Sequence, residues 1–170
     1  NGDPYLIVTP DLRNAQGASV DEQRENEGLY FRVNRSGVET GYTWKRPDRG
    51  TWRWSWYKHT RGDEYWFEEI FDQAEILMTE MNLLKAEGLY HQGNLAAAAD
   101  IINETRTAAG LNATDAAGTN TSCVPKLPNG SCGNLFEMLK WEKRMENTFH
   151  GPYEYHRDEG VTLSSNFHGH

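Results

Sequence analysis

The sequence has little positive charge and no long apolar run, and both absences limit the function of the protein. Its 17 Lys and Arg residues stand against 25 Asp and Glu residues, which gives a formal net charge of −8. Binding to nucleic acid requires clustered cations, so the sequence argues against nucleic acid and against anionic membrane surfaces as partners. No hydrophobic stretch approaches the roughly 20 residues that a bilayer-spanning helix needs.

Recognisable catalytic patterns are also missing. The sequence has no Gly-rich phosphate loop, no Gly-x-Ser-x-Gly nucleophile turn and no paired Cys and His nucleophile. Carboxylate pairs such as Asp63-Glu64 are interpreted as solvated charge, and His168 and His170 have no third residue at a metal-ligand spacing. We therefore predict that the protein is not an enzyme and that it needs no metal and no cofactor.

Cysteine is scarce, and the two cysteines that are present lie close together. Cys123 and Cys132 flank a short segment with two prolines and an Asn-Gly turn pair, a composition that brings the two ends together. The spacing differs from that of a CxxC redox or zinc pair. We predict a disulfide, which places the chain outside the cytoplasm. The alternative is two free thiols in a cytosolic loop.

Asn-X-Ser/Thr triplets are frequent in this sequence. They are the acceptor pattern for N-glycosylation, which modifies surface loops of secreted proteins. Two interpretations are open: a glycosylated surface, or an Asn- and Thr-rich chain that is never modified. The triplets begin at Asn34, Asn103, Asn112, Asn120 and Asn129.

Aromatic residues are abundant, with 6 Trp and 8 Tyr. Trp52, Trp54 and Trp56 alternate with other residues, so an extended strand would direct all three indoles to one face. Such a ladder either packs on helices, which is the favoured interpretation, or forms a platform on which sugar rings stack. The predicted glycan-stacking residues are Trp52, Trp54, Trp56, Tyr57 and Trp66.

The spacing of apolar residues predicts a mainly α fold with little strand. Gly93 suits the left-handed conformation that ends a helix and Asn94 suits the start of the next, so the first two helices are expected to form a hairpin. A third helix follows after a long loop, and Gly151-Pro152 ends it. The predicted helices cover about 64–91, 94–109 and 134–149.

Each predicted helix has an apolar stripe, which we expect to form the core. We also expect Met78 to be buried. The first stripe contains Ile70, Ala74, Leu77, Met81, Leu84 and Gly88. The second contains Leu95, Ala98, Ile102, Thr105 and Ala109. The third contains Leu135, Met138, Leu139, Glu142 and Met145, with Trp141 at its edge.

The helices divide the chain into three predicted parts. The N-terminal part is irregular, and two short apolar runs in it are expected to be strands or extended segments. These runs are 5–8 and 29–33. The parts are an extended, aromatic-rich segment over 1–62, a helical domain over 63–160 and a loose tail over 161–170.

Two blocks of the helical part resemble a known family. The first block contains Ala-Glu-Gly at a helix end, a Gly-Asn turn, an Ile-Asn-x-x-Arg run and a closing Ala-Gly-Leu; it covers residues 83–111. The second block, WEKRMENTFHG, covers residues 141–151 and carries Glu142, Lys143 and Arg144. In order and spacing, the blocks resemble the C-terminal part of SusD/RagB nutrient-uptake proteins, with its last tetratricopeptide-like hairpin.

The resemblance implies both a fold and a role. It implies a tetratricopeptide-like helical hairpin in a non-catalytic protein at the outer-membrane surface of a Gram-negative bacterium. Such proteins cover a TonB-dependent outer-membrane transporter and capture oligosaccharides or peptides. The family has no single ligand motif, so the resemblance assigns no binding residue here.

The chain also departs from the family pattern. After Gly151 the family continues with an Arg and an Asp-Leu-x-Arg segment, whereas this chain has Tyr153, His156 and Glu159. Family members are several hundred residues long and carry a lipidated N-terminal cysteine. This chain begins at Asn1. It is therefore expected to be a fragment of such a protein or a divergent protein that reuses this part.

The alternative hypothesis is structural rather than ligand-binding. The same cysteines and Asn-X-Ser/Thr triplets suit a secreted, N-glycosylated subunit of an extracellular assembly or fibre. The long extended N-terminal segment would then mediate self-assembly.

Overall fold

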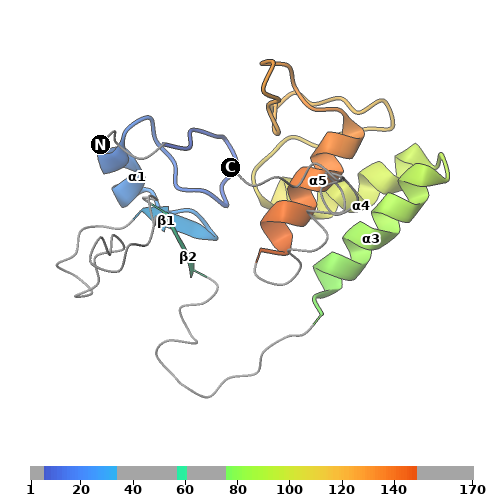
Figure 1. The fold of residues 1–170 in the computed structure, drawn as a ribbon, viewed down its shortest axis with the longest axis horizontal. Helices are drawn as coiled ribbons and strands as arrows, with labels where there is room; N and C mark the ends of the chain where they lie inside the picture. Colours follow the sequence, from blue (N-terminus) through green and yellow to red (C-terminus); the bar gives the residue numbers. More distant parts are fainter. Residues whose placement is uncertain (1–5, 34–56, 61–75, 149–170) are drawn as a thin grey trace, which may run out of the picture. The chain divides into compact units, whose positions relative to one another are not determined.

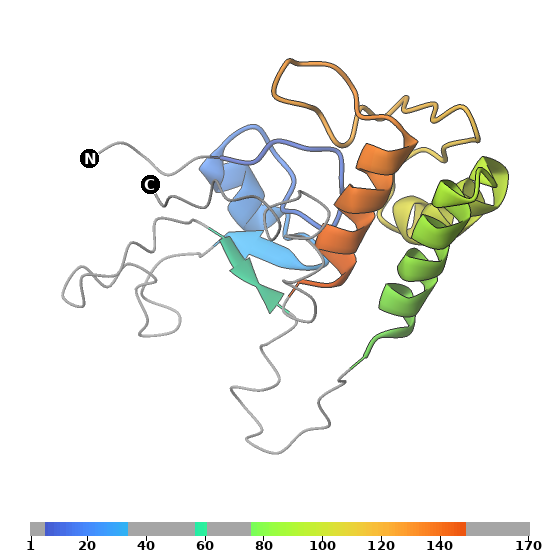
Figure 2. The ribbon, with the colours of Figure 1, turned by 45° about the vertical axis from the view of Figure 1, so that its right-hand side comes forward.

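The computed structural model describes residues 6–33, 57–60 and 76–148, and the account of the fold is confined to them. The chain forms two compact units, Asn1–Asp72 and Gln73–His170, and each is described by itself (Figures 1 and 2). The sequence predicted a boundary after residue 62. The predicted tail over 161–170 lies outside the described residues.

The first unit contains one short helix and two paired strands. Helix α1 (Val20–Glu25) begins with a capping box, in which Ser19 Oγ accepts a hydrogen bond from the Glu22 backbone at 3.2 Å and the Glu22 carboxylate accepts one from the Ser19 backbone. Strand β1 (Phe31–Val33) pairs antiparallel with β2 (Tyr57–His59), with Phe31 opposite His59. Strand β1 thus lies within the apolar run predicted to be extended.

Among the described residues of the first unit, more polar than apolar side chains are buried. The carboxylate of Asp11 accepts two hydrogen bonds from the Arg13 guanidinium, at 2.9 and 2.8 Å, and both side chains are almost completely buried. Gln23, which is also buried, donates to the Ile7 carbonyl at 2.7 Å. Because these buried groups have partners, the cost of removing them from water is largely offset.

The second unit is a helical hairpin with a third helix packed on it, which confirms the predicted mainly α fold. The helices are α3 (Met78–His91), α4 (Leu95–Ala108) and α5 (Leu135–Glu146). Gly93, with φ of +81°, makes the predicted left-handed turn, and Asn94 occupies the N-cap of α4. All three helices contact one another, so the hairpin and α5 enclose one core (Figure 1).

That core is small and draws on all three helices. Its α5 members and Ile102 of α4 were predicted to be buried and are. Burial of this apolar surface, at about 25 cal/mol per Å², is the main favourable term for the unit. The core cluster consists of Leu83, Ala86, Ala99, Ile102, Leu135, Met138 and Leu139.

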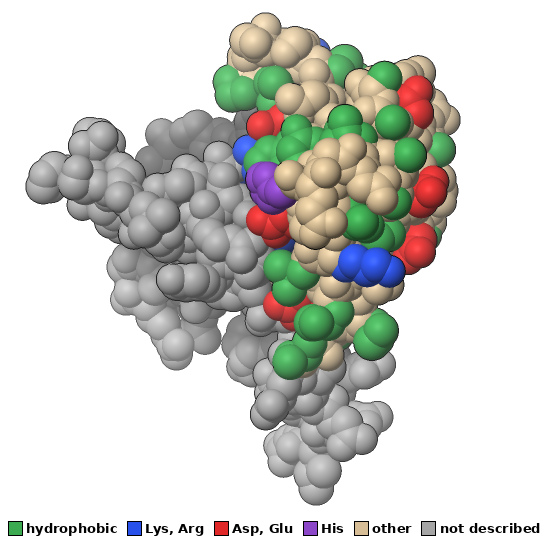
Figure 3. Space-filling model, turned by 90° about the vertical axis from the view of Figure 1, so that its right-hand side faces the viewer, with side chains coloured by type: hydrophobic (Ala, Val, Ile, Leu, Met, Phe, Trp, Pro, Cys, Tyr) green, Lys and Arg blue, Asp and Glu red, His purple; other side chains and the backbone are tan. Residues whose placement is uncertain are grey.

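Helix α3 differs from its prediction at both its start and its buried face. Leu77 is extended, so the helix begins at Met78 rather than near residue 64; residues 64–75 lie outside the described ones. The predicted burial of Met78 and Met81 is wrong, because these side chains are 74% and 49% exposed. Figure 3 views the molecule from the side on which α3 lies in Figure 1, and it shows hydrophobic side chains at that surface. Helix α3 instead packs through Leu83 and Ala86, a face shifted around the helix.

This shift yields a test with two substitutions. Leu139→Ala removes a fully buried side chain, and we expect it to lower the free energy of unfolding by about 2–5 kcal/mol. Met81→Ala removes a half-exposed one and should change it by about 0.5 kcal/mol or less. Urea denaturation measures both. Equal losses would show that the methionine stripe is part of the core after all.

Candidate functional site

Of the five predicted glycan-stacking residues, only Tyr57 lies within the residues that the structure describes. Trp52, Trp54, Trp56 and Trp66 lie outside the described residues, so their role stays a prediction. Tyr57 is described, and its hydroxyl donates to Gln23 Oε1 at 2.6 Å and accepts from the Ile7 backbone at 2.8 Å. These bonds tie β2 to α1 and to the N-terminal segment. The hydroxyl of Tyr57 therefore has a structural role.

In the second unit, the most deeply buried charges lie between α4 and α5. Arg106 and Glu142 are both 0% exposed, and Arg106 Nη1 lies 3.8 Å from Glu142 Oε1. The second carboxylate oxygen accepts a hydrogen bond of 2.9 Å from Thr105 Oγ1. A charge buried this deeply is tolerated only when it is paired and hydrogen-bonded. These residues are therefore part of the framework that joins α4 and α5.

A second ion pair joins α5 to α3. Lys143 Nζ donates to Glu87 Oε2 at 2.9 Å, and the two side chains are only 3% and 17% exposed. Glu87 belongs to the Ala-Glu-Gly element and Lys143 to the WEKR element of the two sequence blocks. With Arg106 and Glu142, the charged residues of one block thus pair with those of the other. The spacing along the chain alone did not predict this pairing.

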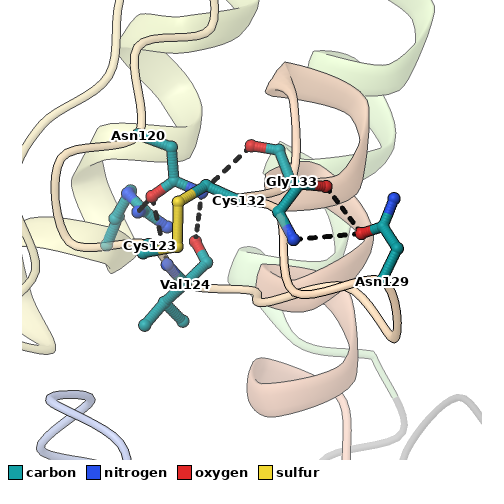
Figure 4. The surroundings of a disulfide bond; sticks show 8 residues. Asn120, Cys123, Val124, Asn129, Cys132 and Gly133 are labelled. Carbon is teal, nitrogen blue, oxygen red and sulfur yellow. Dashed lines mark hydrogen bonds between the residues drawn. A yellow bond between two sulfur atoms is a disulfide. The ribbon is translucent and has the colours of Figure 1, made fainter.

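The long loop between α4 and α5 is anchored by the same arginine. Arg106 Nε donates to the Asn112 carbonyl at 3.0 Å and Nη2 donates to Asn120 Oδ1 at 2.8 Å. Asn120 in turn donates from Nδ2 to the carbonyls of Val124 and Gly133 (Figure 4). One guanidinium and one amide therefore hold both ends of the loop against the helices.

A disulfide closes the far part of this loop, as predicted. Cys123 and Cys132 are joined, with their Cα atoms 4.7 Å apart. An isolated bridge between Lys126 and Cys132 and a hydrogen bond of 2.8 Å from Leu127 N to the Ser131 carbonyl make the enclosed segment a small hairpin. The crosslink limits how far this exposed segment can open.

Near the start of the loop, a carboxylate organises a turn. Asp115 accepts hydrogen bonds of 3.0 Å from Thr119 N and 2.9 Å from Thr119 Oγ1. These bonds, the backbone one first, lower the pKa of Asp115 below its ordinary value. The ionised Asp115 carboxylate therefore stabilises the turn fully above the pKa that this group has in the unfolded chain. This stabilisation is lost as the pH falls through the lower pKa of the folded state.

Three rings form a partly exposed surface that the sequence did not reveal. This aromatic cluster consists of Tyr90, His91 and Phe136. The rings of Tyr90 and Phe136 stack with centroids 5.0 Å apart, and His91 meets Phe136 edge-on at 5.7 Å. Lys140 Nζ lies 5.7 Å from the centre of the Phe136 ring. Rings beside nitrogen donors can stack on a sugar, although Tyr90 and Phe136 also pack against the core.

Other kinds of site find no support within the described ranges. No group of three or more His, Cys, Asp or Glu side chains there is arranged to hold a metal ion. None of the described helices has the length and apolar character to cross a membrane. Comparisons with protein-family models, with curated proteins and with solved structures found no match to this chain.

The buried arginine can be tested against the lysine of the other pair. Arg106→Met leaves Glu142 buried without its cation and the Asn112 carbonyl without a donor, so we expect a loss of about 3–5 kcal/mol of unfolding free energy. Lys143→Met should cost less, about 1.5–3 kcal/mol, because it removes a single charged hydrogen bond and Glu87 is 17% exposed. Chemical denaturation compares the two. If Arg106→Met lowers the free energy of unfolding by less than Lys143→Met does, Arg106 does not have the central role that we assign to it.

The crosslink calls for a test of its own. Replacing Cys123 and Cys132 together by Ser removes a short-loop constraint, and we expect about 2–3 kcal/mol of destabilisation. Hydrogen exchange should show faster exchange at the Val124 amide, whereas the amides within α3 keep their relative protection. Uniform loss of protection across both regions would show that the disulfide supports the helices as well as the loop.

Proposed function

We propose that this protein is a non-catalytic glycan- or nutrient-binding protein of the SusD/RagB type. It acts outside the cytoplasm, at the outer-membrane surface of a Gram-negative bacterium. There it holds an oligosaccharide or peptide for a TonB-dependent transporter. We infer the transporter and the cellular location from the resemblance of residues 83–111 and 141–151 to this family.

The observation that carries the proposal is the pairing of the two sequence blocks. Glu87 pairs with Lys143, and Arg106 pairs with Glu142, so the charged residues on which the resemblance rests meet within one helical unit. A chance likeness in two separate stretches gives no reason for their charged residues to be complementary in space. The pairing supports a shared framework rather than two unrelated helices.

The disulfide supports the proposed location. Disulfides persist in oxidising compartments and are rare in the cytosol, where thiols are kept reduced. The bond between Cys123 and Cys132 lies in a loop where Cys132 is exposed, and a reducing environment would reach it. This favours a position outside the cytoplasm.

The charged side chains that link the two sequence blocks are used for packing. Glu142 and Arg106 are fully buried, and Glu87 is held by Lys143. Glycoside hydrolysis needs two carboxyl groups that face each other across an open cleft. Ligand capture needs instead aromatic surfaces with nearby donors, and the tryptophans of 52–56 and the aromatic cluster are our candidates.

Titration of the purified chain with neutral oligosaccharides tests the proposal. We expect binding that Trp52→Ala and Trp56→Ala each weaken about tenfold, which corresponds to ~1.4 kcal/mol. The reason is loss of the indole face on which a sugar ring stacks. Isothermal titration calorimetry gives the affinities, and the bound oligosaccharide should be recovered uncleaved.

Ser55→Ala is the matched control, because Ser55 alternates with the tryptophans and should leave the affinity unchanged. Circular dichroism and the thermal midpoint report whether each variant is folded. Tryptophan variants that unfold would place the indoles in a core and refute the stacking surface. Cleaved oligosaccharide would refute the non-catalytic role.

A further inference from the structure

Four of the five Asn-X-Ser/Thr triplets fall within the described residues, and the side-chain amides of two of them, Asn103 and Asn120, anchor the loop by hydrogen bonds. Asn103 donates from Nδ2 to the Thr114 carbonyl at 2.9 Å and accepts from the Thr114 backbone at 2.8 Å. Asn120 donates both of its amide hydrogens, to Val124 and to Gly133, and accepts from Arg106. A sugar replaces one of the two hydrogens on the amide nitrogen, so a glycan on Asn120 would remove one of its two donated hydrogen bonds. A glycan on Asn103 would have to fit beside the bond to Thr114 at a partly buried position.

The triplet at Asn112 is blocked in a different way. Asn112 is exposed, but its Nδ2 donates to Thr121 Oγ1 at 3.0 Å. The hydroxyl of its third residue, Thr114, is buried, and that residue is only 7% exposed. Since an acceptor triplet is recognised through both the Asn and the hydroxyl residue, this one is only half accessible.

Asn129 has the opposite character. It lies at the tip of the disulfide-closed hairpin, and Asn129, Gly130 and Ser131 are all exposed. Its Oδ1 accepts hydrogen bonds from Ser131 N at 3.0 Å and from Ser131 Oγ at 2.7 Å. Figure 4 shows the Nδ2 directed away from these two bonds. No described residue accepts a hydrogen bond from that nitrogen, and the space around Gly130 is open.

We propose that Asn129 is a glycan acceptor in the folded protein and that the triplets at Asn103, Asn112 and Asn120 are not. The oligosaccharide comes from a lipid-diphosphate donor. Asn129 Nδ2 forms a bond to the anomeric carbon of the first sugar and loses one proton to the transferase. The bond from that carbon to the diphosphate oxygen breaks, and the lipid diphosphate leaves with the electron pair.

The native hydrogen bonds suit this transfer. The two bonds from Ser131 are made to the amide oxygen, so they leave the nitrogen and its hydrogens open to the transferase. They also hold the hydroxyl of the third residue beside the amide. The disulfide between Cys123 and Cys132 keeps this hairpin closed, so the acceptor is presented without unfolding.

Glycosylation in vitro tests the inference on the full chain. The folded, disulfide-bonded protein, carrying Asn34→Gln because Asn34 lies outside the described residues, is incubated with a lipid-linked oligosaccharide and a single-subunit oligosaccharyltransferase. We expect one glycan per chain, mapped by peptide mass spectrometry to Asn129. Asn129→Gln and Ser131→Ala should each abolish it, whereas Ser131→Thr should retain it.

Asn112→Gln is the matched control and should leave the single glycan in place. The reduced and unfolded chain should gain glycans at Asn103 and Asn120, which shows that the fold and not the local sequence excludes them. A glycan on Asn103, Asn112 or Asn120 of the folded chain would overturn the inference. So would an unmodified Asn129 in the folded chain when the unfolded chain is modified elsewhere. This assay is independent of oligosaccharide binding, so the proposed function can fail without it.

Discussion

The buried guanidinium of Arg106 is the constraint on which most of the second unit depends. A positive charge with no exposure to water requires a compensating anion and hydrogen-bond acceptors. The Glu142 carboxylate of α5 lies 3.8 Å from Nη1, and the Asn112 carbonyl and Asn120 Oδ1 accept hydrogen bonds from Nε and Nη2. Because these partners come from α5 and from both parts of the long loop, satisfying one charge places a helix and a loop of more than twenty residues together.

The reliance on buried polar groups follows from how little apolar surface the helices can offer. Helix α4 is rich in alanine, and α3 directs two methionines toward water. The first unit also contains buried polar groups, since Asp11 and Arg13 form a buried ion pair and Gln23 is fully buried. Such pairs add little net stability, because desolvation offsets their attraction, but they are costly to break. They therefore specify one arrangement more than they stabilise it.

The α4–α5 loop has its own framework of hydrogen bonds and a crosslink. Its root is fixed by Arg106 and Asn120, and the disulfide closes its far part, where residues 128–131 are exposed. The aromatic cluster lies elsewhere on the unit, at the end of α3 and the first turn of α5. The proposed ligand surface and the proposed glycan acceptor therefore use different residues of the second unit.

The sequence by itself determined the elements whose causes are local. The left-handed glycine at position 93, the period of α5 and the closely spaced cysteines each predicted a feature that the structure contains. The buried face of α3 could not be predicted, because the predicted stripe ran through Leu77, which is extended and precedes the first residue of the helix. The partners of Arg106 could not be predicted either, nor could the difference in accessibility between the side chains of Asn120 and Asn129. Those depend on which groups, distant in the chain, exclude water from a side chain, and only the tertiary structure decides that.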